Sequence, residues 1–447
     1  MARRRVLFIN RSYWPDVEAT GQLLTELCES LAHEFEVHVL CGQPRRVLDV
    51  ETYVRRGADS RNGVTIHRVR HTQFNKASFF GRIVNMITFQ ASAAWQALRA
   101  PRPDIVVTET DPPFLCLLGW LLQSLRRCQH IAYLQDIYPD VAVALGKLKT
   151  SWHSDLLRRL FLAAYRRSRG VIVLSRDMRE LLIDSGLPGS LISVIPNWAD
   201  TQAIYPAKSN NHFRRRHGLQ RDFVVMYSGN MGLSQRLDEV LEAAELLIDR
   251  DNIMFVLVGD GAERSRLEQL AAHRHLRNVR FFDYQAKADL ADSLSAADVH
   301  LIILRPEIKR LLMPSKLYGI LASDTPAIVW ADPDCELAHV VASNDLGTVA
   351  SASRATDLAE VIRQAADSPD VVARQGRAAR AYALKHCGRD RSVYLIRTLL
   401  GGPPPSGKRD VVDRGRQAEV LAGAEAETSI QRPSPGRLSE TPCQTIC

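Results

Sequence analysis

Short apolar runs rich in Val and Ile alternate along most of the chain with longer stretches of helical periodicity. In the first half these runs fall at residues 6–9, 37–40, 64–69, 105–108, 131–134, 171–174 and 193–195. After the first run, Leu23, Leu24, Leu27 and Leu31 recur at a spacing that places them on one helix face. Such alternation is typical of βα units around a parallel sheet. The first half therefore predicts one α/β domain.

The same alternation restarts after the turn-like sequence Pro196-Asn197-Trp198. Its runs fall at 223–227, 254–258, 279–282, 299–303 and 327–330, and its helical stretches at 237–248, 264–273, 290–296, 371–386 and 392–400. A segment of mixed Pro, Ser, Glu and Arg follows, which is typical of disorder. We predict an α/β domain over 1–198, a second over 199–385, a helix over 386–400 that packs back toward the first domain, and a disordered tail over 401–447.

Length and charge add two constraints. A chain of 447 residues exceeds the size at which one hydrophobic core keeps growing, so two domains are expected. All of the net charge of +8 lies in residues 1–198, which hold 26 Lys and Arg against 18 Asp and Glu. The basic stretch at 147–179 indicates either a solvated helix face or attraction to an anionic membrane. Nucleic acid is disfavoured as a partner because stacking aromatics are not interleaved with the basic residues.

The sequence also limits where the protein resides and which cofactors it uses. The longest apolar segment, 114–125, is too short to span a bilayer, and the apolar run at 6–9 is too short for a signal peptide. The eight cysteines are scattered and lack metal-binding spacing. We expect a cytoplasmic protein with reduced thiols and no metal or other cofactor.

Three glycine-bearing loops each follow a predicted strand and precede a predicted helix. They are 13–21, which ends in Thr20-Gly21, then 228–232, which contains Gly229 and Asn230, and Gly259-Asp260-Gly261. Glycine allows a ligand to approach the backbone, and a helix N-terminus attracts phosphate. One such loop is weak evidence, but three across two domains favour a ligand cleft between the domains.

Two further segments carry candidate chemistry. Pro314-Ser315 opens a predicted helix after a polar loop that contains Arg305, and simple helix capping would explain the pair. Lys316, however, opposes the helix dipole in the first turn, which favours contact with a bound phosphate. Asp136 follows the predicted strand 131–134 and is either a catalytic carboxylate or a turn residue. Spacing alone leaves that choice open.

Several longer strings, loose individually but specific as an ordered set, resemble one protein family. From about residue 5 to residue 400, the chain is similar to the retaining glycosyltransferases of GT-B fold of the family 4 type, in the branch that assembles colanic-acid-like and O-antigen polysaccharides. The strings are YWPDVEATGQLLTEL, QDIYPDVAVALGKL, VIPNWAD, YSGNMGLSQRLDEVLEAA, FVLVGDGAERSRLE, SAADVHLIIL and MPSKLYGILASDTPAIV.

The resemblance implies an α/β fold of two Rossmann-like domains whose parallel sheets face a central cleft. It implies an acceptor site near Thr20 and Gly21, with catalysis by Asp136 and Lys316. Departing diphosphate would be stabilised by cations and helix N-termini without a metal. The implied donor-binding residues of the second domain are Gly229, Asn230, Gln235, Gly259, Asp260, Gly261, Arg305, Ser315, Lys316 and Leu317.

The implied activity is transfer of a sugar, with retention, from a nucleotide sugar to a lipid-linked or other saccharide acceptor at the inner face of the plasma membrane. The chain departs from the wider family because a common glutamate pair falls on Leu311 and Gly319, and a common His falls on Gln135. We interpret these departures as a variant of the branch. One alternative is a catalytically silent subunit that binds nucleotide sugar, or a partner of another transferase. Another is an epimerase, which would need an acid–base cluster that the sequence does not display.

Overall fold

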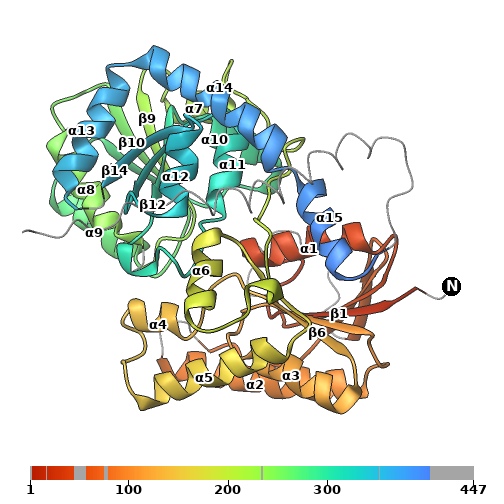
Figure 1. The fold of residues 1–447 in the computed structure, drawn as a ribbon. Coiled ribbons are helices and arrows are strands. Elements are labelled where there is room, and N and C mark those ends of the chain that lie inside the picture. The colour runs from red at the N-terminus through yellow and green to blue at the C-terminus, as the bar shows by residue number, and fades with distance from the viewer. Residues whose placement is uncertain are drawn as a thin grey trace, which may run out of the picture. The chain divides into compact units, whose positions relative to one another are not determined.

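The computed structural model describes residues 3–16, 18–44, 57–74, 79–232, 235–351 and 353–402. Contacts join the chain up to Gly401 into one compact unit, in which Figure 1 shows two separate sheets. The tail predicted at 401–447 lies outside the described residues from 403 onward, and so does Val17 in the first glycine-bearing loop.

Among the described residues, eight strands form the first sheet in the order β3-β4-β2-β1-β5-β6-β7-β8. Neighbouring strands are parallel except for the antiparallel pair of β3 and β4. In register, Val6 lies opposite Val37 on one side and Ile105 on the other. The strands are β1 Arg5–Ile9, β2 Glu36–Cys41, β3 Gly57–Arg61, β4 Val64–Arg68, β5 Ile105–Thr108, β6 Gln129–Tyr133, β7 Gly170–Val173 and β8 Ile192–Val194.

Helices cover both faces of this sheet, which explains the continuous apolar runs. Val6 and Phe8 of β1 share a buried cluster with Leu27 of α1, while Leu7 shares another with Phe89 of α2. In Figure 1, α2, α3 and α5 lie together along the lower side of the sheet, and α3 contacts both neighbours. The helical elements of this half are α1 Ala19–Leu31, α2 Phe79–Arg99, α3 Leu115–Arg126, α4 Asp140–Ala144, α5 Trp152–Arg167, α6 Arg176–Asp184 and η1 Gly189–Leu191.

Six parallel strands form the described second sheet in the order β11-β10-β9-β12-β13-β14. They are β9 Phe223–Ser228, β10 Ile253–Val258, β11 Val279–Phe282, β12 Val299–Ile303, β13 Ala327–Ala331 and β14 Gly347–Ser351. The helical elements of this half are α7 His212–His217, α8 Leu237–Leu246, α9 Arg264–His273, η3 Lys287–Asp289, α10 Leu290–Ser295, η4 Pro306–Ile308, α11 Lys316–Ala322, α12 Glu336–Ser343, α13 Ala355–Ala366 and α14 Pro369–His386.

The strand order reverses direction at the centre of each sheet, between β1 and β5 and between β9 and β12. Loops that leave neighbouring strands at such a switch point turn to opposite faces and open a crevice at the carboxyl ends of the strands. Ligands of doubly wound α/β domains bind in this crevice. Each half of the chain therefore presents one candidate binding edge.

The apolar pattern predicted the twelve strands listed in the sequence analysis, and the structure confirms each within a residue or two. It missed β3 and β14, which lie at the edges of their sheets. Their sequences, GADSR and GTVAS, are mostly small or polar. An edge strand pairs on one side only, so it needs less apolar surface to be held in place.

The last described helix, α15 Arg389–Leu399, packs against α1 of the first half (Figure 1). The guanidinium of Arg397 lies 2.8 Å from the carboxylate of Glu34, and the hydroxyl of Ser392 donates to the carbonyl of Pro196 over 2.8 Å. The chain thus leaves the second sheet and returns to the first, where its helix contributes to the same packing.

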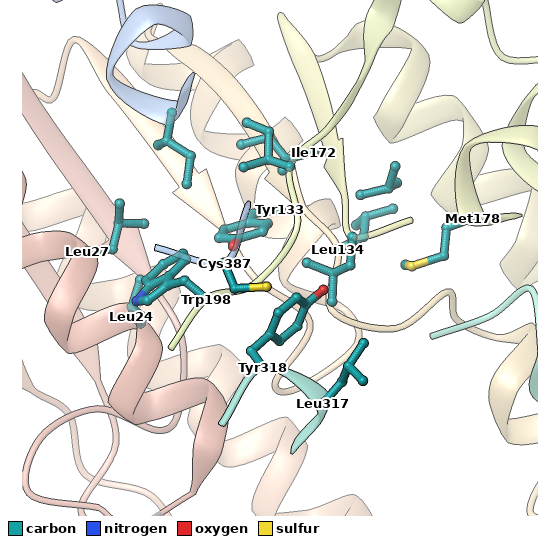
Figure 2. Close-up of a cluster of buried hydrophobic side chains, with 14 of the residues drawn as sticks. Leu24, Leu27, Tyr133, Leu134, Ile172, Met178, Trp198, Leu317, Tyr318 and Cys387 are labelled. Atoms are coloured by element: carbon teal, nitrogen blue, oxygen red, sulfur yellow. The ribbon is translucent and has the colours of Figure 1, made fainter. Parts of the chain in front are cut away.

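A buried apolar cluster joins the two halves (Figure 2). We call it the junction cluster. Leu317 and Tyr318, from the first turn of α11, pack there with Leu134 just beyond β6, and each is at most 5% exposed. Its labelled members are Leu24, Leu27, Tyr133, Leu134, Ile172, Met178, Trp198, Leu317, Tyr318 and Cys387.

Truncation in the junction cluster tests its contribution to stability. We expect Leu317→Ala to lower the free energy of unfolding by about 2–5 kcal/mol, because the variant loses apolar burial and leaves a cavity. Urea unfolding of purified protein measures this change. The matched substitution Leu246→Ala, at a side chain that is 52% exposed on α8, should change it by about 0.5 kcal/mol or less. Equal effects of the two substitutions would contradict the central role of the cluster.

Candidate active site

Two glycine-bearing loops of the second half touch each other at the ends of the adjacent strands β9 and β10. Gly229 has φ +138° and Gly259 has φ +139°, a region that side chains rarely adopt. A Cβ atom on Gly259 would lie 2.0 Å from the carbonyl oxygen of Gly229, and one on Gly261 would lie 2.3 Å from that of Met231. The close approach of the two loop backbones therefore requires glycine at positions 259 and 261, whether or not a ligand also binds there.

Backbone hydrogen bonds hold the two loops in this arrangement. The amide of Met231 donates to the carbonyl of Asp260 over 2.9 Å, and the amide of Gly261 donates to the Asp260 carboxylate over 2.7 Å. The carbonyl of Asn230 accepts from the hydroxyl of Tyr227 over 2.7 Å, while the residue itself is exposed. The amide of Gln235 donates to the carbonyl of Gly232. These contacts form a rigid rim beside the switch point.

Lys316, the first residue of α11, extends to the same rim. Its Nζ atom is 3.7 Å from the centre of the Tyr227 ring, and a Cβ atom on Gly229 would lie 3.1 Å from it. This nitrogen is buried, and within the described residues it has no hydrogen-bond partner. Burial lowers the pKa of Lys316 to about 7. A buried amine without an anion is unfavourable when charged, so this position favours an anionic ligand.

The neighbours of Lys316 differ in what they offer a ligand. Ser315 occupies the N-cap position of α11, but its backbone is helical and its side chain forms no capping hydrogen bond in the described structure. The capping interpretation therefore does not explain the serine. Leu317 was predicted to bind the donor, but its side chain is 1% exposed in the junction cluster. That side chain is used in the core, and the predicted role of Leu317 in donor binding stays a prediction.

Arg305 follows β12 on the other side of the switch point. Its guanidinium is paired with Glu307 at 3.3 Å, and its side chain is partly exposed. The described contacts do not bring it to Lys316. Its predicted role in donor binding stays a prediction.

Carboxyl groups gather at the corresponding edge of the first sheet. Glu109 and Asp111 follow β5, and Asp136 follows β6. Burial and the negative charge of Asp111 raise the pKa of Asp136 to about 6, and Lys147 opposes the rise. Burial and Asp111 likewise raise the pKa of Glu109 to about 8. At neutral pH, Asp136 is therefore largely ionised and Glu109 largely protonated.

A chain of side-chain contacts holds Glu109 in place. The amide nitrogen of Gln135 lies 3.4 Å from a Glu109 oxygen, and the oxygen of Gln135 accepts from Asn197 over 3.1 Å. Gln135 thereby links the carboxyl group to the crossover between the halves. On the other side, Arg11 after β1 pairs with Asp111 at 2.8 Å.

Backbone pairing joins the two edges. Asp136 forms an antiparallel bridge with Leu312, and the amide of Ile137 donates to the carbonyl of Leu311 over 2.9 Å. Leu312 lies shortly before Lys316 in the sequence. The bridge therefore holds the loop that leads into α11 against the segment that carries Asp136. Leu311, one of the two positions of the missing glutamate pair, is buried and contributes this bond. At the other position, Gly319, a side chain would meet Leu294 and Ile204.

The predicted acceptor residues have a packing explanation. A Cβ atom on Gly21 would lie 2.7 Å from the hydroxyl oxygen of Ser12 and 3.1 Å from the amide nitrogen of Tyr13. Gly21 is therefore required for α1 to approach the loop after β1. Thr20 is half-buried at the start of the same helix. Acceptor binding by these two residues stays a prediction.

Sequence reasoning missed Arg11, Glu109 and Asp111. A signal was present, because each follows one of the predicted strands 6–9 and 105–108, and these two strands flank the switch point. The structure also has a groove of about 310 Å³ between α4 and η4 that contains none of the predicted site residues. It is lined by Asp140, Val143, Ala144, Leu181, Pro306, Glu307, Lys309, Arg310 and Leu311.

The described ranges contain no group of three or more His, Cys, Asp or Glu residues that is arranged to hold a metal ion. Nor does any helix in them combine the length and apolarity needed to cross a membrane.

Two doubly wound domains that share one crevice define the GT-B class of protein. The chain matches the family described as Glycosyltransferase Family 4 over residues 20–203 and the family described as Glycosyl transferases group 1 over residues 209–382. It therefore belongs to the glycosyltransferases that combine these two domains, and it is an enzyme of this kind.

Two curated relatives are bacterial. The putative colanic acid biosynthesis glycosyl transferase WcaI of Escherichia coli K12 is 26% identical over 349 residues, covering 75% of this chain and 85% of the relative. The probable glycosyltransferase WbjE of Pseudomonas aeruginosa is 28% identical over 252 residues, covering 56% of this chain and 62% of the relative. The branch expected from the sequence strings is the one that these relatives represent.

Solved structures confirm the fold. Sucrose-phosphate synthase from Thermosynechococcus elongatus has a TM-score of 0.71 at 17% identity, over 89% of this chain and 98% of that one. WaaG, a glycosyltransferase involved in lipopolysaccharide biosynthesis, has a TM-score of 0.67 at 18% identity, over 89% of this chain and 100% of that one. Anabaena HepE, solved with UDP-glucose, has a TM-score of 0.68 at 16% identity, over 89% and 99%. At these identities the likeness shows the fold.

The raised pKa of Glu109 predicts how stability depends on pH. The unfolded carboxyl releases its proton near pH 4.5 and the folded one near pH 8, so the fold binds an extra proton between these values. The contribution of Glu109 to the free energy of unfolding is fully present below about pH 4.5 and is lost as the pH rises to about 8. Relative to Glu109→Gln, which cannot ionise, wild type should lose up to about 1.4 kcal/mol per pH unit in this window. Urea unfolding of both proteins across the window measures the difference, and a constant difference would refute the shift.

Proposed function

We propose that the enzyme transfers a sugar from a nucleotide-sugar donor to a saccharide acceptor in the assembly of an exopolysaccharide or O-antigen. The observation that carries the proposal is the buried Nζ of Lys316, which has no hydrogen-bond partner in the described residues and lies beside Gly229. The names of WcaI, WbjE and WaaG support the polysaccharide role, and the HepE complex with UDP-glucose supports a nucleotide sugar as donor.

In this proposal the second domain binds the donor. The diphosphate lies against Lys316, Ser315 and the loop at Gly229, and the nucleoside lies toward the loop that contains Gly259 and Gly261. The diphosphate keeps Lys316 charged, because an anion within hydrogen-bond distance stabilises the ammonium form. Negative charge grows on the leaving diphosphate as the sugar bond breaks, and a fixed cation lowers the energy of that state without a metal ion.

The first domain presents the acceptor in this proposal. An acceptor hydroxyl lies near Asp136 and Gly21. Its oxygen forms the new bond to the anomeric carbon on the same face from which the diphosphate departs, as retention of configuration requires. Asp136, ionised at neutral pH, accepts the proton of that hydroxyl. We propose retention of configuration and a lipid-linked acceptor, and accordingly a cytoplasmic enzyme that acts peripherally at the inner face of the plasma membrane. The excess of basic residues before residue 199 supports that location.

Removal of the Lys316 ammonium tests the donor site. We expect Lys316→Ala to lower kcat about 10²–10³-fold, as for other lost electrostatic contacts to a transition state. The assay follows nucleoside diphosphate release from UDP-, GDP- and dTDP-sugars with and without membrane extract. Lys208→Ala is a matched control, because Lys208 pairs with Asp324 elsewhere in the second domain.

Calorimetry separates binding from folding in the same variants. Since the pKa of Lys316 is about 7 in the empty site, nucleoside diphosphate binding at pH 8 should take up a proton, and this uptake should vanish in Lys316→Ala. Unchanged turnover in Lys316→Ala would return Lys316 to a structural role. Saturable binding of a donor by wild type, without release from any donor, would instead indicate a silent binding subunit.

The pH profile tests Asp136. Wild-type kcat/KM should fall as pH drops below about 6, because protonation of Asp136 removes the group that accepts the proton. Asp136→Asn should lower kcat/KM about 10²–10⁴-fold and abolish that limb of the profile. Asp251→Asn is the control, since Asp251 is an exposed partner of Arg277. An unchanged acid limb in Asp136→Asn would show that another group titrates there.

A further inference from the structure

One layer of helices on the first domain is apolar on both sides. The inward side of α2, α3 and α5 contributes Phe89, Leu118 and Phe161 to buried clusters. Because α3 contacts both α2 and α5, the outward sides of the three helices form one continuous surface (Figure 1). We call it the helix-layer face.

Large apolar side chains remain exposed on each helix of this face. Ile87 and Trp95 of α2 are each 58% exposed, Leu125 of α3 is 60% exposed, and Trp152 of α5 is 69% exposed. Further members follow at helical spacing on the same sides of the helices, so that each helix carries an outward stripe. These are Val84 and Leu98 on α2, Leu121 on α3, and Leu156 and Leu160 on α5.

Basic residues predominate on the three helices. They contain seven arginines and one acidic residue, Asp155, which pairs with Arg158. The guanidinium of Arg99 lies 3.5 Å from the centre of the Trp95 ring. Arg82 and Arg159 are exposed. Interfacial helices combine apolar stripes with tryptophan and arginine in this way, and soluble proteins rarely expose so large an apolar patch without a binding partner.

We propose that the helix-layer face is the surface by which this enzyme docks on an anionic lipid membrane. Its apolar stripes enter the boundary between headgroups and acyl chains, and its arginines bind the negatively charged headgroups. The proposal deepens the proposed function, on which it rests for the reason why docking is useful. A protein partner would be expected to match the exposed arginines, such as Arg82 and Arg159, with its own acidic residues, whereas a membrane supplies negative charge and apolar depth over the whole face.

The location of the face agrees with a lipid-linked acceptor. Burial lowers the pKa of Lys147, and the positive charge of Arg82 on α2 adds to the effect. Lys147 in turn acts on Asp136. The start of α2 is therefore close enough to the proposed acceptor side of the active site to influence its charges, and a membrane against this face would lie on that side of α2.

The helix-layer face differs from the basic stretch at 147–179 that the sequence offered for membrane attraction. Only the α5 portion of that stretch belongs to the helix-layer face. Lys147 lies before α5 and acts electrostatically on Asp136, and Arg176 pairs with Glu336 of the second domain. Apolar members of the face also lie on α2 and α3, outside that stretch, and charge alone did not indicate them.

Vesicle flotation of the full chain tests the docking face. Wild type should bind vesicles of phosphatidylethanolamine and phosphatidylglycerol, and bind phosphatidylcholine vesicles much more weakly. Leu125→Ser and Ile87→Ser should each weaken binding about tenfold, because each removes one inserted apolar side chain. Arg159→Gln should weaken it about fivefold, and high salt should remove that difference. Leu384→Ser on α14, 57% exposed, is the matched control and should bind as wild type.

Three results would overturn the docking face. They are equal effects of Leu125→Ser and Leu384→Ser, wild-type binding that ignores headgroup charge, and a solution dimer that Leu125→Ser dissociates. Donor hydrolysis without vesicles tests the proposed function separately, and Leu125→Ser should leave it unchanged. Vesicle binding by a wild type that releases no nucleoside diphosphate would retain the docking face and reject the transferase proposal.

Discussion

The packing of α11 against the first sheet is the contact on which the candidate site depends. Leu317 and Tyr318 lie in the junction cluster (Figure 2). The residue before them, Lys316, extends to the second sheet at Tyr227. A close-packed apolar core leaves little freedom to the helix that enters it. The start of α11 is therefore fixed by apolar burial, and the bridge between Asp136 and Leu312 fixes the register of the loop before it.

Burial also sets the electrostatics of the empty site. It disfavours the charged form of every group, so it lowers the pKa of Lys316 to about 7 and raises those of Asp136 to about 6 and Glu109 to about 8. The site thus stores unfavourable interactions that a diphosphate and a hydroxyl-bearing acceptor would relieve. Apolar packing at the junction cluster and in both sheets offsets this cost, which lets the fold keep a cleft ready for polar ligands.

Most of the fold could be predicted because buried parallel strands are continuous apolar runs, whereas the edge strands β3 and β14 escaped because they are not. The site was harder. A glycine can make room either for a ligand or for a neighbouring backbone. The sequence therefore could not show that Gly259 packs against Gly229. Leu317 was assigned with Lys316 as one motif, although successive residues on a helix point about 100° apart and meet different surroundings. In the sequence, Glu109 is one of several acidic residues that follow a strand, and only the structure shows that it is buried.

The helix layer shows why charge alone was an incomplete guide to the membrane. Its helices must bury one side against the first sheet, which requires apolar residues such as Phe89 and Leu118. The outward apolar residues, such as Trp95 and Leu125, are not needed for that packing, and exposing them to water brings the fold no stability. Their presence beside seven arginines is understandable if a second apolar medium covers them. In the proposed arrangement, the sheet and the membrane share one layer of helices, so docking requires no element beyond those that the first domain already needs to fold.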